Sequence, residues 1–174
     1  LARPEGEDAT GWRLELPAPR KTRLGDFRVA VMLDSPVAAT DSSVVAVLER
    51  CVAQLAEQGV SVDFKARPDI DFAHAHRLFM SMLRAAMAAA DDDELHEAHV
   101  KAAAAFADDD DSYEAMMARA AAWSHQKWFH AHKERNLIRE KWASFFNDYD
   151  LMLTPVAATA AYIRDTRSEE RRVG

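Results

Sequence analysis

WASFFNDYDLMLTPVAATAAY, residues 142–162, contains the most informative pattern in this sequence. It begins as the end of an amphipathic helix, because Ile138, Trp142 and Phe145 follow at spacings of four and three residues and therefore share one face. An Asn-Asp pair then interrupts the pattern with residue types that favour turns. Residues 150–155, Asp-Leu-Met-Leu-Thr-Pro, indicate a short buried strand closed by a proline. A helix that leads into a short apolar strand is typical of an α/β sheet.

A strand–helix–strand unit is predicted upstream of this stretch, over residues 27–66. Residues 27–32 form a dense apolar run that indicates a buried strand. Apolar residues recur with helical spacing over 43–58, after a Thr-Asp-Ser sequence that offers N-capping oxygens and before Gly59, which favours a helix end. Residues 60–66 alternate between apolar and polar side chains, as a half-buried strand does. Short connections between these elements predict a βαβ unit.

Residues 70–146 are predicted to form a helical layer, because they are rich in alanine, methionine, glutamate and arginine. The acidic runs 91–93 and 108–111 lack the alternating oxygen ligands and central glycine of a calcium loop, and they fit helix starts, with Asp111 in the capping position. The last helix is expected to run from 113 to 146, about 50 Å. Its expected buried residues are Trp128, Ile138, Trp142 and Phe145.

The two ends of the chain are expected to lie outside the core. Residues 1–23 show no sustained hydrophobic periodicity and contain Pro4, Gly6, Gly11, Pro17 and Pro19. This composition predicts an extended connector, anchored by Trp12 and Leu14. Residues 167–174 follow a change of composition and are interpreted as a non-native tail, which leaves 1–166 as part of one domain. The first residue is leucine rather than methionine, so we expect further residues to precede it.

Composition excludes several classes of partner. The 174 residues are 49% hydrophobic and 29% charged, and their net charge is −7, which argues against nucleic acid or an anionic membrane as a partner. No apolar run reaches the length of about 20 residues that spans a bilayer. The single cysteine, Cys51, is expected to be buried and structural. One cysteine allows no disulfide within the chain, which fits a cytoplasmic protein.

Three segments carry a resemblance to a known family. Within residues 145–162, an aromatic pair is followed by Tyr-Asp, an apolar strand, Thr-Pro and a run of small residues. Residues 11–20, GWRLELPAPR, and 24–31, LGDFRVAV, precede it at a matching distance. Together these segments resemble the amidase signature family, whose members include amidases, allophanate hydrolases and the glutamyl-tRNA amidotransferase A proteins.

The resemblance implies an α/β fold with a mixed sheet flanked by helices, to which this mostly helical chain would contribute two or three strands. It also implies a hydrolase of linear amides that needs no cofactor and works through an acyl-serine intermediate. Such enzymes use a nucleophilic serine, a second serine and a lysine base in a loop rich in glycine and serine. Here the five glycines are never adjacent, the pair Ser42 and Ser43 begins a predicted helix, and no lysine has a matching context. We therefore assign no catalytic residue to this chain, and we expect it to be inactive alone.

The resemblance does suggest residues that line a substrate pocket. In this family the loop after the buried strand approaches the active site, so Thr154 and Pro155 are the candidate substrate-lining residues. The alternative, that Thr154 simply ends a strand, stays open. No metal site is predicted, because His96 and His99 lack the zincin spacing and an evident third ligand.

A non-enzymatic function is the alternative to an amide hydrolase. In that interpretation the helix predicted over residues 113–146 presents an aromatic stripe to a protein partner. The expected partners are thus a small-molecule amide in the intact enzyme, or a protein in the alternative, and a homodimer is compatible with both.

Overall fold

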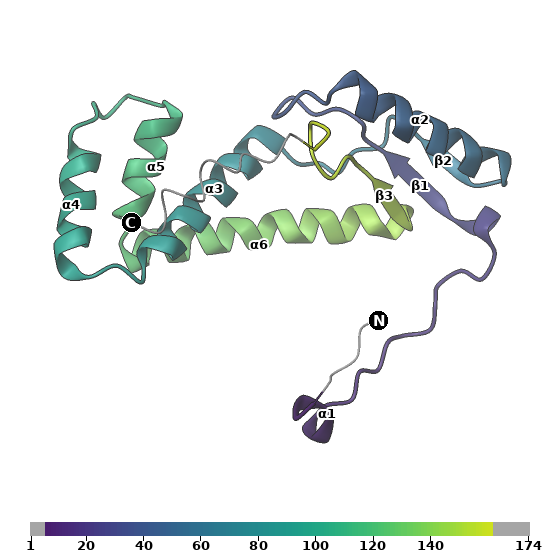
Figure 1. Ribbon diagram of the computed structural model, residues 1–174, viewed down its shortest axis with the longest axis horizontal. Coiled ribbons are helices and arrows are strands. Elements are labelled where there is room, and N and C mark those ends of the chain that lie inside the picture. The colour runs from purple at the N-terminus through teal and green to yellow at the C-terminus, as the bar shows by residue number, and fades with distance from the viewer. Residues whose placement is uncertain (1–5, 162–174) are drawn as a thin grey trace.

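Within the part of the chain that the structure describes, three short parallel strands form a sheet (Figure 1). The computed structural model describes residues 6–161. Strands β1 (Arg28–Val31), β2 (Ser61–Asp63) and β3 (Leu151–Leu153) lie in the order β2-β1-β3, with β1 in the centre. Both neighbours of β1 run parallel to it. The predicted fold class, α/β with a helical majority and two or three strands, is confirmed.

The β1–α2–β2 unit forms as the sequence predicts. Helix α2 (Ser42–Glu57) begins at Asp41, whose side chain accepts a hydrogen bond from the backbone N–H of Ser43 at 2.8 Å. It ends before Gly59, which adopts a φ of 87°, a left-handed conformation that favours glycine. Strand β2 is shorter than predicted, because Asp63 Oδ1 accepts the backbone N–H groups of the two residues that turn the chain away from the sheet, Lys65 and Ala66.

The central strand packs on both faces, as a parallel strand does. Val29 and Val31 face α2 and form one core cluster with Val52 and Val60. Ala30 points to the opposite face and packs against the end of the last helix. The alternation of side chains along β1 therefore places α2 on one side of the sheet and the helical layer on the other.

The helical layer contains four helices, and one prediction about it is wrong. Helices α3 (Phe72–Ala88) and α4 (Asp93–Ala104) are followed by α5 (Tyr113–Ala121) and α6 (His125–Asp148). The sequence predicted a single helix in place of the last two. The chain turns between them because the Ser124 side chain accepts the backbone N–H of Lys127 and starts a new helix.

Two further local predictions need correction. The capping residue of α5 is Ser112, which accepts the N–H of Ala115, rather than Asp111. Cys51 is exposed rather than buried, because α2 turns its other apolar stripe toward the sheet. Of the predicted core residues of the last helix, only Phe145 is buried, and the others are half-buried.

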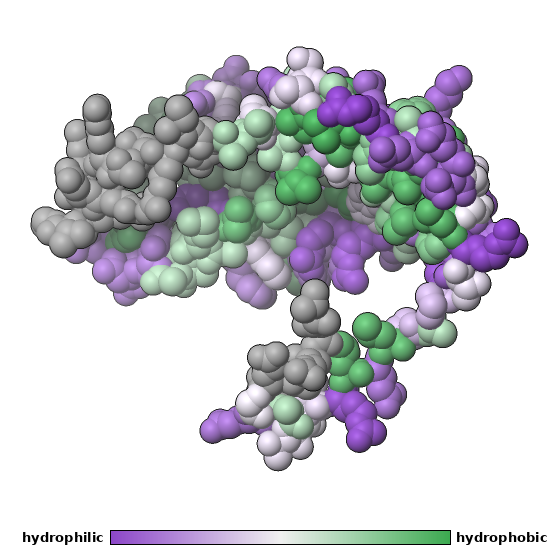
Figure 2. Space-filling model, turned by 45° about the vertical axis from the view of Figure 1, so that its right-hand side comes forward, coloured by the Kyte–Doolittle hydropathy of each residue, from purple (hydrophilic) through white to green (hydrophobic). Residues whose placement is uncertain are grey.

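Most of the connector stands apart from the body, as Figures 1 and 2 show. It contains the short helix α1 (Asp8–Gly11), and the 3-10 turn η1 (Leu24–Asp26) follows it at the edge of the body. The predicted anchoring by Trp12 and Leu14 is wrong, since 74% of Trp12 and 46% of Leu14 are exposed. The predicted tail, residues 167–174, lies outside the described residues. None of the helices within residues 6–161 combines the length and the apolar composition that crossing a bilayer requires.

Candidate functional site

A hollow of about 390 Å³ lies at the carboxyl ends of the two adjacent strands β1 and β3. Three parts of the chain surround it: the loop from β1 to α2, one aromatic residue from each of α3 and α6, and the loop after β3. Its lining residues are Met32, Asp34, Ser35, Ala38, Thr40, Phe72, Trp142, Thr154, Pro155, Val156, Ala157 and Ala158.

The topology of the sheet makes this edge the expected place for a ligand. From β1 the chain crosses to β2 on one side, and it later returns to β3 on the other side of β1. The right-handed rule for parallel strands requires these two connections to cover opposite faces, and the two core clusters agree. In open α/β sheets, ligands bind outside the carboxyl ends of the strands where the strand order reverses. The hollow occupies that position.

The two residues predicted to line a substrate pocket, Thr154 and Pro155, both border the hollow. They follow β3 directly, and the Met32 N–H donates to the Leu153 carbonyl at 2.9 Å, so β1 and β3 are paired up to the edge of the hollow. Thr154 is exposed and Pro155 is half-buried. The loop beyond them is held by a hydrogen bond of 2.7 Å from the Asp41 N–H to the Ala158 carbonyl.

Aromatic rings form another side of the hollow, and the sequence analysis did not predict them there. Phe72, at the start of α3, meets Trp142 of α6 edge-on, with ring centroids 6.4 Å apart. Trp142 also stacks on Phe146, whose ring centroid is 5.8 Å away. These rings give the hollow a rigid apolar side that suits an apolar substituent of a ligand.

The polar side of the hollow is the loop from β1 to α2, which sequence reasoning also missed. Asp34 Oδ1 accepts the backbone N–H of Thr40 at 3.2 Å, and Ser35 Oγ accepts the N–H of Val37 at 3.3 Å. These bonds hold the loop folded over the sheet edge. The available signal was the run of polar residues directly after a predicted parallel strand, because strand ends carry binding residues in such sheets.

The polar side chains of the hollow come from Asp34, Ser35, Thr40 and Thr154. Among the described residues that line it, none is a histidine, lysine or cysteine that would act as a base or as an activated nucleophile. The pair Ser42 and Ser43 begins α2, as predicted, but the capping residue is Asp41, to whose Oδ1 the Ser43 hydroxyl donates. This side-chain hydrogen bond is the largest cause that lowers the pKa of Asp41, and the hydrogen bond from the Ser43 backbone N–H is the second.

Two of the histidines pair with carboxylates. His74 Nε2 lies 2.9 Å from Glu134 Oε1, and His99 Nε2 lies 2.8 Å from Asp91 Oδ2. Within residues 6–161, no group of three or more histidine, cysteine, aspartate or glutamate side chains is arranged to hold a metal ion.

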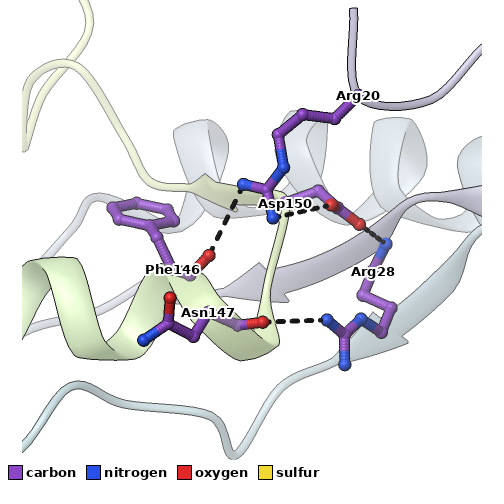
Figure 3. Close-up of polar contacts among 5 residues, drawn as sticks. All are labelled: Arg20, Arg28, Phe146, Asn147 and Asp150. Carbon is purple, nitrogen blue, oxygen red and sulfur yellow. Dashed lines mark hydrogen bonds and ion pairs between the residues drawn. The ribbon is translucent and has the colours of Figure 1, made fainter.

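The strand that delivers Thr154 and Pro155 is fixed by polar contacts at its start, shown in Figure 3. Asp150 Oδ2 accepts the backbone N–H of Arg28 at 2.8 Å, while the Arg28 side chain donates to the Asn147 carbonyl at 3.2 Å. The Arg20 guanidinium lies 3.5 Å from the Phe146 carbonyl and 3.8 Å from Asp150 Oδ1. Two arginines thus complement the negative C-terminal end of α6.

Comparison with known proteins agrees with the resemblance found in the sequence. The family model described as Amidase matches residues 7–173, nearly the whole chain. No curated protein and no solved structure gave a significant match. Because the family model covers far more than half of the chain, this protein belongs to the Amidase family.

Proposed function

We propose that this chain is part of an amide hydrolase and that it lines the acyl side of the substrate site, while the nucleophilic serine comes from residues outside it. The observation that carries the proposal is the hollow at the reversal point of the sheet, bordered by Thr154 and Pro155, in a chain of the Amidase family. The family match supports the class of reaction, and the position of the hollow supports a binding role.

The proposed reaction has two steps. A serine oxygen attacks the amide carbonyl carbon, the C–N bond breaks, and the leaving amine takes a proton, which gives an acyl ester on the serine. Water then attacks this ester, releases the carboxylic acid and returns the proton to the serine. In this scheme the hollow holds the acyl group against the rings of Phe72 and Trp142 during both steps.

Release of ammonia from linear amides tests the class of reaction. We expect turnover by the natural full-length protein and none by residues 1–174 alone. A serine-directed fluorophosphonate probe is expected to label the full-length protein and to block turnover. Amide turnover by residues 1–174 alone, or turnover that survives complete labelling, would contradict the proposed mechanism.

Two substitutions test the role of the hollow in the full-length enzyme. Val156, fully exposed at its mouth, tolerates a larger side chain sterically, so Val156→Trp should lower kcat/KM for amides with bulky acyl groups at least about 5-fold while sparing acetamide. Thr154→Val should change KM by removing a hydroxyl that borders the hollow. Two control variants, Val47→Trp on the exposed side of α2 and Thr22→Val in the connector, should leave both kcat/KM and KM unchanged. Equal effects of Val156→Trp on small and bulky amides would argue against the binding role.

The partner and location follow from the same proposal. The substrate is a small linear amide, and the enzyme works in the cytoplasm. Fractionation of the native host should therefore recover it with cytoplasmic markers, and recovery with an extracellular fraction would refute the location.

A helical interaction domain is the second candidate function. It is favoured by the exposed side chains Phe79, Leu83 and Met87, which follow one another every four residues along α3. Size-exclusion chromatography of residues 1–174 separates the two proposals. A folded chain that forms a homodimer or binds a protein partner without further residues supports interaction, whereas a chain that folds only with the rest of the enzyme supports the hydrolase.

A further inference from the structure

A second hollow, of about 600 Å³, lies between α3 and α6, with a set of lining residues different from that of the first. One end is closed by Met116 of α5 and by Trp123, just before α6. The residues around it are His74, Arg77, Leu78, Ser81, Met116, Trp123, Lys127, His130, Ala131, Glu134 and Leu137. Its volume is within the range of about 300–1,000 Å³ that small-molecule sites occupy.

The floor of this groove is largely apolar, with one buried serine, Ser81. Leu78 and Ala131, from the two facing helices, are buried members of one core cluster, which Trp123 also contacts. Met116 is buried beside them. Burial of the hydrocarbon part of a ligand against such apolar side chains is favourable, because these side chains have no hydrogen bonds to lose.

The rim of the groove carries an excess of positive charge. The guanidinium of Arg77 is held in place by a hydrogen bond of 3.1 Å to the Asp111 carbonyl, and the ammonium of Lys127 lies 5.5 Å from the centroid of the Trp123 ring. The single carboxylate among the lining residues, Glu134, is engaged by His74 at 2.9 Å. This local sign is the opposite of the net charge of −7 of the chain.

We propose that the groove between α3 and α6 binds a small organic anion with an apolar body, of the class of a medium-chain or aromatic carboxylate. The carboxylate lies between Arg77 and Lys127, and the hydrocarbon part lies over Leu78, Met116 and Ala131. Arginine suits this position because its planar donors match a carboxylate with two parallel hydrogen bonds. The site is distinct from the hollow at the sheet edge and does not depend on amide chemistry.

Isothermal titration of the natural full-length protein with octanoate tests the proposal. Saturable binding is expected, at least about 5-fold tighter than that of octan-1-ol, which has the same chain without the charge. Lys127→Gln is expected to weaken octanoate binding about 5-fold, and Lys127→Glu to weaken it further by reversing the charge. Arg77→Ala should act like Lys127→Gln.

A matched control is available on the neighbouring helix. Lys101 of α4 is exposed and pairs only distantly with Glu97, so Lys101→Gln removes the same charge away from the groove and should leave octanoate binding unchanged. If Arg77→Ala does not fold, the two Lys127 variants decide the matter alone. The proposal is overturned if octanoate shows no saturable binding, if octan-1-ol binds as tightly, or if Lys101→Gln weakens binding as much as Lys127→Gln.

Discussion

Arg28 and Asp150, 122 positions apart in the sequence, exchange two hydrogen bonds across the start of the sheet. The backbone N–H of Asp150 donates to the Arg28 carbonyl at 2.9 Å, and the Arg28 N–H donates to Asp150 Oδ2 at 2.8 Å. The Asp150 side chain is only 3% exposed. The backbone bond from Arg28 is the largest cause that lowers the pKa of Asp150, and the nearby positive charges of Lys21, Arg20 and Arg28 add to it. This pair sets the register in which β3 joins β1 and therefore positions the loop that borders the first hollow.

Removal of the Asp150 carboxylate is the first test of this arrangement. Asp150→Ala should destabilise the protein, because it removes a side chain that is only 3% exposed and leaves the Arg28 N–H without its acceptor. Asp150→Asn keeps one acceptor oxygen but loses the attraction of the arginines, so its effect should be intermediate. Asp148→Ala, two residues earlier on the exposed end of α6, is the control. Urea denaturation of the full-length protein measures all three, and equal midpoints for Asp150→Ala and Asp148→Ala would contradict the role of Asp150.

The bond between Tyr149 and Asp63 predicts a pH dependence. The Tyr149 hydroxyl donates to Asp63 Oδ2 at 2.6 Å, and this bond is the main cause that lowers the pKa of Asp63 below its ordinary value of 3.8. A lowered carboxylate pKa contributes stability that is present above the unfolded-state pKa and is lost as pH falls through the folded-state value. The same bond raises the pKa of Tyr149 above its ordinary value of 10.0. The stability that Tyr149 contributes is therefore fully present below the unfolded-state pKa and is lost as pH rises through the folded-state value.

Tyr149→Phe should therefore make the free energy of unfolding depend less on pH at both the acidic and the alkaline end. Urea midpoints measured from pH 2.5 to 5 should fall less steeply for Tyr149→Phe than for the natural protein. Tyr113→Phe, on the exposed start of α5, should leave the profile unchanged. Parallel profiles for Tyr149→Phe and the natural protein would show that Asp63 does not depend on this hydroxyl.

Phe145 is predicted to be the most sensitive position on α6. It is 8% exposed, packs against Ala30 of the central strand, and stacks on Tyr149 with ring centroids 4.9 Å apart. Phe145→Ala should lower the free energy of unfolding by about 3–5 kcal/mol, because it opens a cavity between α6 and the sheet. Phe129→Ala, on the exposed side of the same helix, should cost less than about 1 kcal/mol. Similar losses for both variants would mean that α6 does not pack on the sheet through Phe145.

Substitution of Ser124 tests whether its side chain helps to separate α5 from α6. Its side chain accepts the Lys127 N–H at 3.2 Å and begins α6. Ser124→Ala should cost about 1 kcal/mol through loss of this cap. Ser144→Ala, inside the same helix and exposed, should be neutral or slightly stabilising, because alanine is the better helix former. A neutral Ser124→Ala would favour a continuous helix through this region.

The strands and most helices were predictable because their signals are local. Asp41 and Gly59 bracket α2 with a cap and a stop that act within one turn. The break at Ser124 was missed because good helix formers lie on both sides of it, alanine and methionine before it and lysine, glutamate, arginine and leucine after it, and one capping serine is a weak signal in such surroundings.

Burial on α2 was mispredicted for a different reason. The helix is apolar over a wide arc, with one stripe through Cys51 and another through Val52. Either stripe satisfies helical periodicity, and only packing against Val29 and Val31 selects the second. The choice depends on tertiary contacts that the sequence of one helix does not contain.

The candidate site was predictable in part. Thr154 and Pro155, which border the hollow, were predicted from the family resemblance, which places the loop after the buried strand near the active site. The aromatic side of the hollow was not predicted, because Phe72 and Trp142 are 70 positions apart and meet only when α3 and α6 pack. Prediction of the loop from Asp34 to Thr40 as part of the site required the strand order. That order places the carboxyl end of β1, where this loop begins, beside the carboxyl end of β3.

Identification of the residue that carries the acyl group tests the central claim most directly. The natural full-length protein would be mixed with a bulky linear amide, quenched with acid during turnover, digested and analysed by mass spectrometry. We predict an acyl ester on a serine outside residues 1–174, together with loss of the adduct when that serine is replaced by alanine. An acyl group on Cys51 or on a serine within this chain, or full amide turnover with no acylated residue, would contradict the proposal.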